Sequence, residues 1–538
     1  MKRFTTSLLA LCALTLSLSA KPARRHAISL TQPDGTQLTA FLHGDAYYHY
    51  YTDAYGNMLQ RDAEGFYQAT TMPSDDELQA RRQSSPRMVA RQRMVGSELN
   101  LAPRGLIILV SFTDLAFSTP QAEMDSMLNG QNYNRLYAFR DNGRLRQVMS
   151  SGSARQYFQD NSLGQYNPVF DVVGPVTVSK GYAYYGGNDY NGNDKNPEKM
   201  VQEACQLVND EVDFTLYDND NDGTVDFVYV IYAGYGESDG AGDDYIWPHS
   251  YALSYGGVSC VVDGMHVESY ACSNEIDYFN RKHDGIGTFC HEFSHVLGMP
   301  DLYATDNSYH KTMGQWDIMD YGPYNNDGNT PPNYSAYERF FFGWLTPRLV
   351  NSACDVQLAA LHESNDAVLM TSSGQHNMNG LSPNPTTFYM FENRQKTGWD
   401  AHLPAHGMLI TRVAYSSYKW SSNIVNNTKS SMGVDIIEAD GLAPDYDYSG
   451  ADRGYFGKEG DTYPAGATTF TKLSAFKVTD IEETNGLITF KVNGGNPVPL
   501  AVENAEQPSG TQIRKVIREG QLLIEHNGAY YNLLGNTY

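Results

Sequence analysis

His291, Glu292 and His295 form a His-Glu-x-x-His motif, the residue set of this chain with the most definite chemistry. Residues four positions apart lie on one face of an α-helix, so both imidazoles can bind one metal ion while Glu292 stands beside it. Gly298 can take the left-handed conformation that ends a helix, and the chain then returns Asp301 towards the metal as a candidate third ligand. Three protein ligands plus water are the arrangement of catalytic zinc.

The flanking sequence favours the helix that this site needs. Asp284 and Gly285 form a helix start, and Gly298 followed by Pro300 forms a stop. Apolar side chains for packing follow at Phe289, Phe293, Val296 and Leu297. Two alternatives remain open. The histidines of a buried helix can simply make core hydrogen bonds, and a glutamate further along, such as Glu338, can supply the third ligand instead.

A glutamate beside a metal-bound water takes its proton and so makes the site hydrolytic, and we assign this role of general base to Glu292. Residues 316–322 (Trp-Asp-Ile-Met-Asp-Tyr-Gly) are similar to the Met-turn of metzincins, in which a methionine packs beneath the metal. Met319 alone would indicate no more than core packing, so the prediction rests on the two motifs together. Tyr321 is a second catalytic candidate, because it could reach the metal or the developing oxyanion.

Four aspartates lie close together in one loop, at Asp218, Asp220, Asp222 and Asp226. Oxygen ligands around a glycine, here Gly223, suit a hard calcium ion, and four carboxylates this close would repel one another without a cation. The twelfth position of the loop is Tyr229 rather than Glu, so the loop is not a complete EF-hand. We predict a structural calcium site, with a solvated acidic turn as the alternative.

The formal net charge of the chain is -24. Nucleic acids and anionic membrane surfaces both require a basic footprint, so this charge argues against them as partners. Solubility and calcium binding account better for the acidic excess.

Cys12 lies in a predicted signal peptide, and five cysteines remain beyond it: Cys205, Cys260, Cys272, Cys290 and Cys354. Five is an odd number, so at least one thiol stays unpaired within the chain. Cys260 and Cys272 flank a predicted hairpin and are the best candidates for a disulfide. A set of free buried thiols is equally compatible with the sequence.

Residues 1–20 have the basic start, apolar run and small-residue end of a signal peptide, and the run is too short to span a membrane. Residues 21–98 combine a β-rich unit, which has three turn signals including one at 43–45, with a basic segment at 81–93 suited to proteolytic nicking. We predict that residues 21–98 are a propeptide and its linker. A permanent N-terminal domain is the alternative.

Residues 99–349 are the predicted catalytic domain, which opens with a buried strand at 106–110. Short alternating runs separated by Gly, Asn and Pro predict an all-β domain over residues 350–495. The last part, residues 496–538, alternates again and resembles the short β-strand tails of secreted bacterial proteins, some of which anchor the protein at the cell surface. A small terminal hairpin is the alternative.

Four motifs in this order resemble the immune inhibitor A type of secreted bacterial metallopeptidases. They are residues 218–223, residues 246–250 (Ile-Trp-Pro-His-Ser), the zinc helix with residues 300–303, and residues 316–322. The resemblance is specific over residues 100–350 and looser beyond them. It implies a zinc endopeptidase with a metzincin-like catalytic domain, made as a secreted proenzyme. Where many metzincins have a third histidine ligand, this chain has Asp301.

We therefore predict an α+β protein with a metzincin-like zinc peptidase domain, an N-terminal β-rich propeptide and a C-terminal all-β domain. The expected cofactors are zinc and a structural calcium, and the expected partners are protein or peptide substrates and an activating protease. The protein is expected to be secreted, with retention at the cell surface through the tail as an option. A calcium-dependent adhesin with a structural zinc is the competing hypothesis. Glu292 disfavours it, because a structural site needs no base and usually closes with a fourth protein ligand.

Residues 21–93 contain no cysteine, so a propeptide thiol cannot cap the zinc. Residues 41–45 (Phe-Leu-His-Gly-Asp) resemble the Phe-x-Gly-Asp segment with which astacin-type propeptides place a carboxylate on the metal, although there is one extra residue before Gly44. Asp45 is therefore a candidate cap, and a plain turn between strands is the alternative.

Overall fold

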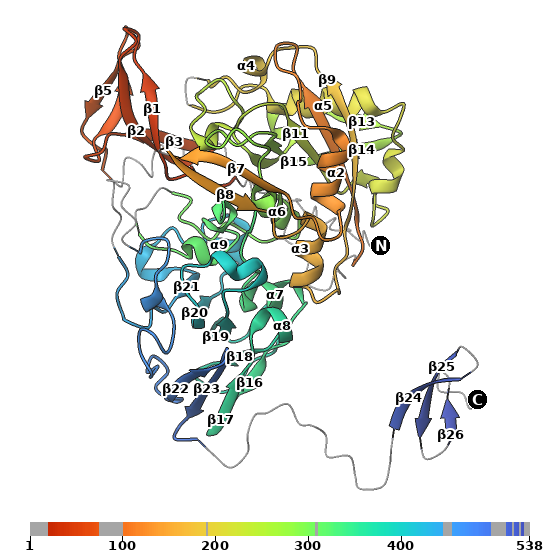
Figure 1. The fold of residues 1–538 in the computed structure, drawn as a ribbon, viewed down its shortest axis with the longest axis vertical. Coiled ribbons are helices and arrows are strands. Elements are labelled where there is room, and N and C mark those ends of the chain that lie inside the picture. Colours follow the sequence, from red (N-terminus) through yellow and green to blue (C-terminus); the bar gives the residue numbers. More distant parts are fainter. Residues whose placement is uncertain are drawn as a thin grey trace, which may run out of the picture.

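The computed structural model describes residues 20–74, 101–141, 143–189, 192–306, 310–444 and 454–495, and the backbone of three strands between residues 513 and 531. Of the predicted signal peptide only Ala20 is described, and the basic segment 81–93 lies outside these ranges. Figure 1 shows a small sheet in red, a larger region of helices and strands in orange to green, and a strand-rich region in teal to blue.

Residues 27–70 form a five-stranded antiparallel sheet whose strands follow one another in chain order. The strands are β1 (Ala27–Thr31), β2 (Gln37–Asp45), β3 (Tyr48–Thr52), β4 (Met58–Arg61) and β5 (Tyr67–Thr70). The turn predicted at 43–45 is wrong, because these residues end β2. The chain turns at the next two residues, where the Asp45 side chain accepts hydrogen bonds from the backbone amides of Tyr47 and Tyr48.

A second five-stranded sheet, in the order β12-β15-β11-β6-β9, forms the centre of the predicted catalytic domain. Its strands are β6 (Arg104–Ser111), β9 (Val169–Thr177), β11 (Val228–Tyr232), β12 (His249–Ala252) and β15 (Ser269–Asn274), and only β12 and β15 pair antiparallel. Successive residues of β6 pack into two cores on opposite faces: Ile107 and Leu109 in one, and Leu106, Ile108 and Val110 in the other. Burial on both faces explains the continuous apolar run of this strand.

Helices cover both faces of this sheet. They are α2 (Gln121–Asn129), α3 (Ala154–Asn161), α4 (Tyr182–Tyr185), α5 (Pro197–Val208), α6 (Ile286–Val296) and α7 (Ala336–Phe342). Side chains of α2, α3 and α6 belong to the core that contains Ile107, whereas those of α5 belong to the opposite core. Within the described residues, no helix is long and apolar enough to cross a membrane.

Smaller elements complete this part of the chain. β7 (Leu136–Asp141) pairs with β8 (Arg144–Met149), and β14 (Met265–Val267) lies between β10 (Thr224–Val225) and β13 (Cys260–Val262). The short 3-10 helices of the molecule are η1 (Phe214–Tyr217), η2 (Glu237–Asp239), η3 (Leu253–Gly256), η4 (Gly314–Trp316), η5 (Gly322–Tyr324), η6 (Gly398–His402), η7 (Lys429–Ser431) and η8 (Glu459–Asp461).

Helix α6 carries the His-Glu-x-x-His motif and has the limits that the sequence predicts. Gly285 is its N-cap and Val296 is its last residue. Gly298 has a φ of 89°, the left-handed conformation that lets the chain turn back towards Asp301. Phe289 and Phe293 are buried against the sheet and anchor the helix there.

The strand-rich region contains two sheets, β16-β18-β19-β20-β21 and β17-β23-β22. Their strands are β16 (Arg348–Val350), β17 (Cys354–Leu358), β18 (Ala367–Met370), β19 (Thr387–Arg394), β20 (Gly407–Ala414), β21 (Val434–Ile436), β22 (Val478–Thr484) and β23 (Leu487–Val492). Two short helices, α8 (Leu361–Ser364) and α9 (Ser417–Ser421), lie between the strands. In the tail, β24 (Ile513–Arg518), β25 (Gln521–His526) and β26 (Ala529–Tyr531) pair as an antiparallel sheet.

All five cysteines within the described ranges are buried and reduced. The sulfur of Cys272 lies 3.7 Å from Nδ1 of His249. The predicted pairing of Cys260 with Cys272 is therefore not formed, because β13 and β15 belong to different sheets.

The core around α6 continues into the strand-rich region. Buried side chains of α7 and of β18, β19 and β20 belong to the same hydrophobic cluster as those of α6. The boundary predicted after residue 349 therefore divides two parts of the chain that share one core.

A buried ion pair also joins these two parts. Nζ of Lys311 lies 2.5 Å from Oδ1 of Asp461, and Oδ2 of Asp461 accepts a hydrogen bond from the Trp316 indole at 3.0 Å. Glu438 lies 3.4 Å from the same ammonium group. Both members of the closest pair are buried, so its loss leaves a poorly compensated charge in the interior.

Asp461→Ala is expected to lower the free energy of unfolding by about 3–5 kcal/mol, because Lys311 then stays buried without its closest partner. Urea unfolding followed by tryptophan fluorescence measures the change. The control is Asp480→Ala, which removes a well-exposed partner of Lys491 and is expected to have little effect. Equal losses in the two variants would contradict a structural role for the buried pair.

Candidate active site

Helix α6 places His291 and His295 one turn apart on the same face, with ring centroids 4.9 Å apart. Both rings face one carboxylate oxygen. Oδ1 of Asp301 lies 3.3 Å from Nε2 of His291 and 3.4 Å from Nε2 of His295, and Asp301 is fully buried. The structure thus brings together the three residues that the sequence predicts as metal ligands.

Nε2 of His291, Nε2 of His295 and Oδ1 of Asp301 have no hydrogen-bond partner among the described residues. The same holds for Oε2 of Glu292. A buried polar atom without a partner costs about 1–3 kcal/mol, so a convergent group of them fits a cation. Two imidazole nitrogens and a carboxylate oxygen are a donor set that suits zinc. Burial alone would raise the pKa of Asp301, but the facing imidazoles outweigh burial and hold the pKa of this carboxyl below its usual range.

Backbone carbonyl groups fix the orientation of both imidazoles. Nδ1 of His291 lies 2.7 Å from the carbonyl oxygen of Ile318, and Nδ1 of His295 lies 2.7 Å from that of Met299. When Nδ1 of each ring donates to its carbonyl, Nε2 is left as the lone-pair nitrogen that a metal needs.

Asn423 holds Asp301 from the other side. Its amide nitrogen donates to Oδ2 of Asp301 at 2.6 Å, and its amide oxygen accepts from the backbone nitrogen of Asp301 at 2.8 Å. Asn423 follows α9, in the part predicted to be a separate β domain, and is not among the residues predicted for the site. No local motif marks it, because the contact spans 122 positions of the chain.

Glu292 is fully buried beside the histidines. Burial, which disfavours the charged form, raises the pKa of its carboxyl to about 8. Glu292 is the residue that the sequence predicts as general base, and its Oε2 has no hydrogen-bond partner among the described residues. Its other oxygen, Oε1, accepts a hydrogen bond from the backbone nitrogen of Lys21 at 3.1 Å.

The predicted Met-turn contacts His291, since Ile318 provides the carbonyl that orients this imidazole. Met319 is fully buried in the core that contains α6, and its carbonyl accepts from the backbone nitrogen of Leu302 at 2.8 Å. The hydroxyl of Tyr321 accepts a hydrogen bond from Nε of Arg25 at 3.3 Å.

Glu338, the alternative third ligand, belongs to the start of α7. Its carboxylate accepts from the backbone nitrogen of Ser335 at 2.6 Å, and the Ser335 hydroxyl accepts from the backbone nitrogen of Glu338, which makes a capping box. The structure therefore brings Asp301, and not Glu338, to the two histidines.

Residues 99–345 match the family described as immune inhibitor A peptidase M6, catalytic domain. This part of the chain is similar to the catalytic domain of the peptidase M6 family. We refer to residues 99–345 as the M6 domain, and it contains the whole convergent site apart from Asn423 and the N-terminal contact.

Two relatives are each similar to part of this chain. Immune inhibitor A of Bacillus thuringiensis subsp. alesti is 26% identical over 306 residues, which cover 51% of this chain and 44% of that protein. The pre-pro-metalloprotease PrtV of two Vibrio cholerae serotype O1 strains is 31% identical over 216 residues, which cover 35% of this chain and 23% of the relative. The chain is thus similar to less than half of the length of either relative.

Residues 20–25, here called the N-terminal segment, lie in the site of the M6 domain. Side chains of the domain hold its carbonyl groups, with Tyr303 donating to Ala20 (2.6 Å), Trp247 to Lys21 (3.0 Å) and Tyr324 to Pro22 (2.6 Å). Asp45, which the sequence suggests as a zinc cap, accepts from the same Tyr303 hydroxyl at 3.2 Å. It lies beside the segment whose Lys21 amide contacts Glu292.

The acidic loop brings three of its four aspartates together. Asp218, Asp220 and Asp222 each offer a carboxylate oxygen, and these oxygens lie within 4.8 Å of one another. Asp226 is not in this group. Its Oδ2 accepts hydrogen bonds from the backbone nitrogen and the side-chain amide of Asn219, at 2.6 and 2.9 Å.

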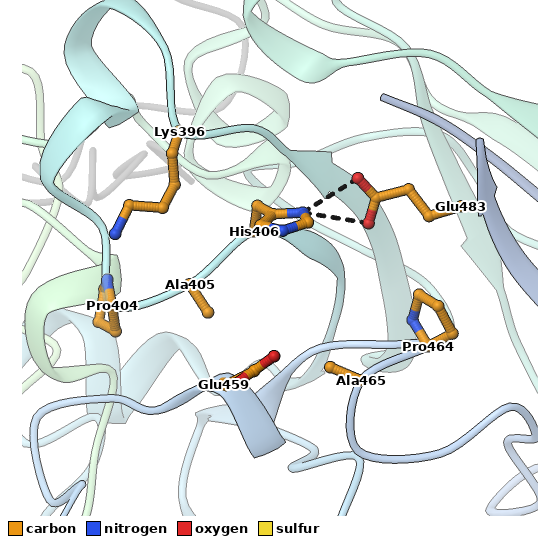
Figure 2. A pocket seen from close by; sticks show the side chains of 8 residues that line it. All are labelled: Lys396, Pro404, Ala405, His406, Glu459, Pro464, Ala465 and Glu483. Atoms are coloured by element: carbon orange, nitrogen blue, oxygen red, sulfur yellow. Dashed lines mark hydrogen bonds and ion pairs between the residues drawn. The ribbon is translucent and has the colours of Figure 1, made fainter. Parts of the chain in front are cut away.

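A separate pocket of about 360 Å³ lies in the strand-rich region (Figure 2). It is lined by Lys396, Pro404, Ala405, His406, Glu459, Pro464, Ala465 and Glu483, and none of these residues is a candidate metal ligand. Figure 2 shows the dashed contacts from Nδ1 of His406 to the Glu483 carboxylate, at 3.0 and 3.2 Å. His406 therefore pairs with a carboxylate of the strand-rich region.

Asn423→Ala is expected to weaken zinc binding by about 10- to 100-fold, because Asp301 loses the amide that orients its carboxylate. Zinc titration of the metal-free protein with a competing chelator measures the affinity. Asn427→Ala is the matched control, since Asn427 lies four positions further on and bonds Thr305 instead of Asp301. Unchanged affinity in Asn423→Ala would show that Asp301 does not need this support.

Proposed function

We propose that this chain is the secreted precursor of a zinc-dependent endopeptidase that hydrolyses extracellular proteins. The observation that carries the proposal is the convergence of two imidazole nitrogens and one carboxylate oxygen, all buried and without hydrogen-bond partners in the described ranges, beside the buried Glu292. The similarity of residues 99–345 to a peptidase family supports the same reaction class. A structural metal site would not require Glu292, which disfavours the adhesin hypothesis.

His291, His295 and Asp301 would hold the zinc. A bound zinc ion lowers the pKa of its water and polarises the scissile carbonyl. The chain's own contribution is positional: the carbonyls of Ile318 and Met299 fix the imidazoles, and the surrounding core excludes bulk water from the ligands.

Glu292 takes the proton from the attacking water and delivers it to the departing amine. Its raised pKa suits the second step, because the protonated form that donates to the amine is accessible near neutral pH. Tyr321 is the proposed stabiliser of the tetrahedral intermediate, once its hydroxyl is released from Arg25.

The N-terminal segment explains why a precursor is part of the proposal. The backbone nitrogen of Lys21 donates to Oε1 of the proposed base, so substrate can enter only after the segment has left. An activating protease that cuts within residues 81–93 would release residues 21–98 as a propeptide. The Vibrio relative is named a pre-pro-metalloprotease, which is consistent with such processing.

The remaining parts of the proposal concern architecture and location. We infer a metzincin-like catalytic domain from the order of the zinc helix and the Met-turn, and a β-rich domain over residues 350–495 that completes its core. The signal peptide at 1–20 directs secretion, and the three-stranded tail is the candidate for surface retention.

We also propose a structural calcium at Asp218, Asp220 and Asp222, whose oxygens converge in the loop before β11. Asp226 supports the loop through Asn219 instead of serving as a direct ligand. Calcium there would fix the approach to a central strand of the M6 domain.

Glu292→Ala, assayed after limited trypsin cleavage of the full chain, is expected to lower casein hydrolysis by about 100- to 10,000-fold and to retain zinc, since it removes the base and leaves the ligands. Asp301→Ala is expected to lose zinc as well. Elemental analysis measures the metal in both, and Glu363→Ala, on an exposed helix, is the control.

Turnover by Glu292→Ala at the wild-type rate would overturn the mechanism. Full zinc occupancy in Asp301→Ala would place the third ligand elsewhere and leave the role of Glu292 intact.

The melting temperature of the wild type is expected to rise with calcium, because binding to the folded state alone stabilises it, by about 2.7 kcal/mol at a calcium concentration of 100 times Kd. Asp220→Ala with Asp222→Ala should abolish this response. The control removes two exposed acids nearby, Asp210→Ala with Glu211→Ala, and should keep it. A wild type that ignores calcium after thorough chelation would reduce the loop to an acidic turn.

A further inference from the structure

Lys21 buries its whole side chain in the M6 domain, with 1% of the residue exposed. Its Nζ donates to Oγ1 of Thr288 at 3.0 Å and lies 3.6 Å from Oδ1 of Asp239 and 4.0 Å from Oδ2 of Asp284. The ring of Tyr324 lies 5.0 Å from the same nitrogen. The domain therefore has an enclosed pocket with an acidic end, and a lysine side chain fits it.

This pocket is next to the proposed base. Thr288 lies one helical turn before Glu292 on α6, so both side chains are on the same face of the helix. The backbone nitrogen of Lys21 donates to Glu292 at 3.1 Å while its ammonium group reaches Thr288. One residue thus spans the distance between the base and the acidic end of the pocket.

The contact with Glu292 identifies which substrate residue the pocket would receive. In the proposed reaction the base passes its proton to the nitrogen of the leaving amine. Lys21 has its backbone nitrogen at that carboxylate, so it occupies the place of the residue directly after the scissile bond. Its side chain then marks the subsite for that residue.

The charges of the pocket require a cation. Asp239 is 2% exposed, and neither of its carboxylate oxygens has a hydrogen-bond partner among the described residues. Among the residues that the structure describes, Lys21 is the only cationic side chain within 4.0 Å of Asp239 or Asp284. Loss of the N-terminal segment leaves both carboxylates without that cation. Asp284 keeps its hydrogen bonds from Gly285 and Thr288, whereas Asp239 is left as a buried carboxylate without a partner among the described residues, which is costly.

We propose that Asp239, Asp284 and Thr288 form a specificity pocket for lysine, so that the mature enzyme preferentially cleaves peptide bonds on the amino side of lysine. This inference rests on the proposed endopeptidase function and adds its substrate class. Lysine is favoured over arginine, because a compact ammonium group with three donors matches one hydroxyl and two carboxylates better than a planar guanidinium fork.

The first test compares quenched peptides that differ only in the residue after the scissile bond, which is lysine, arginine, norleucine or glutamate. The enzyme is the full chain activated by limited trypsin cleavage and freed of its N-terminal fragment. We expect kcat/KM for the lysine peptide to exceed that for norleucine, its uncharged analogue, by about tenfold or more. Equal values for lysine and norleucine would overturn the proposal.

Asp239→Asn keeps the shape of the side chain and removes its charge. It is expected to reduce the ratio of kcat/KM for lysine over norleucine by about fivefold or more while norleucine turnover persists. Asp435→Asn is the control, because Asp435 is a partly buried acid that pairs with Arg412 in the strand-rich region. A ratio that is the same in wild type and Asp239→Asn would exclude Asp239 as the determinant.

A binding measurement separates this inference from the proposed function. An N-acetylated peptide with the sequence of residues 20–26 and its norleucine-21 analogue are titrated into the same activated protein without metal. We expect the lysine peptide to bind about tenfold more tightly, and Asp239→Asn to remove the difference. If the metal-free protein prefers the lysine peptide but the zinc-loaded protein cleaves no peptide, the proposed endopeptidase function would be refuted and the lysine pocket would stand. Equal affinities would refute the pocket whatever the activity.

Discussion

The orientation of the Asp301 carboxylate is the constraint on which the rest of the site depends. One oxygen faces both imidazoles at 3.3 and 3.4 Å, and the other accepts a hydrogen bond from Asn423. The turn at Gly298 brings Asp301 near the helix, and the hydrogen bond from Asn423 to Oδ2 holds the carboxylate with Oδ1 towards the imidazoles. In a buried setting the direction of a charge matters more than in water, because the local dielectric screens it weakly. The proposed metal site is therefore made by two parts of the chain that pack together.

A second consequence of burial is that the M6 domain depends on cations from outside itself. Lys21 meets Asp239 and Asp284, and Arg24 pairs with Asp277 and, at 2.7 Å, with Asp327. The N-terminal segment thus adds cations beside buried carboxylates of the domain, of which Asp327 also pairs with Arg146 of the domain at 3.1 Å. In the proposed precursor these carboxylates hold the segment, and they would be available to a basic substrate once the segment has gone. The proposed latency and the proposed selectivity then have one electrostatic origin.

The sequence predicts the parts of the site that local spacing controls. The limits of α6, the turn at Gly298 and the approach of Asp301 all follow from residues within one short stretch. Asn423 and Lys21 were not predictable in this way, because they reach the site from 122 and 271 positions away and carry no motif. The turn wrongly expected at 43–45 is a similar case. A Gly-Asp pair is a common turn signal, but here the sheet extends β2 through it and moves the turn two residues on.

The boundary after residue 349 illustrates how far the pattern of apolar and polar residues in a sequence can define a domain. This pattern separates a mixed helix-and-strand region from a strand-rich one, and the structure has both. The physical unit is larger, because the core around α6 includes side chains of β18, β19 and β20. Arg394 on β19 donates to the carbonyl of Trp316 at 3.4 Å, and Asp461 accepts from the Trp316 indole. A unit ending at residue 349 would keep both histidines and Glu292, but it would lose the groups that hold the Met-turn and Asp301 in place.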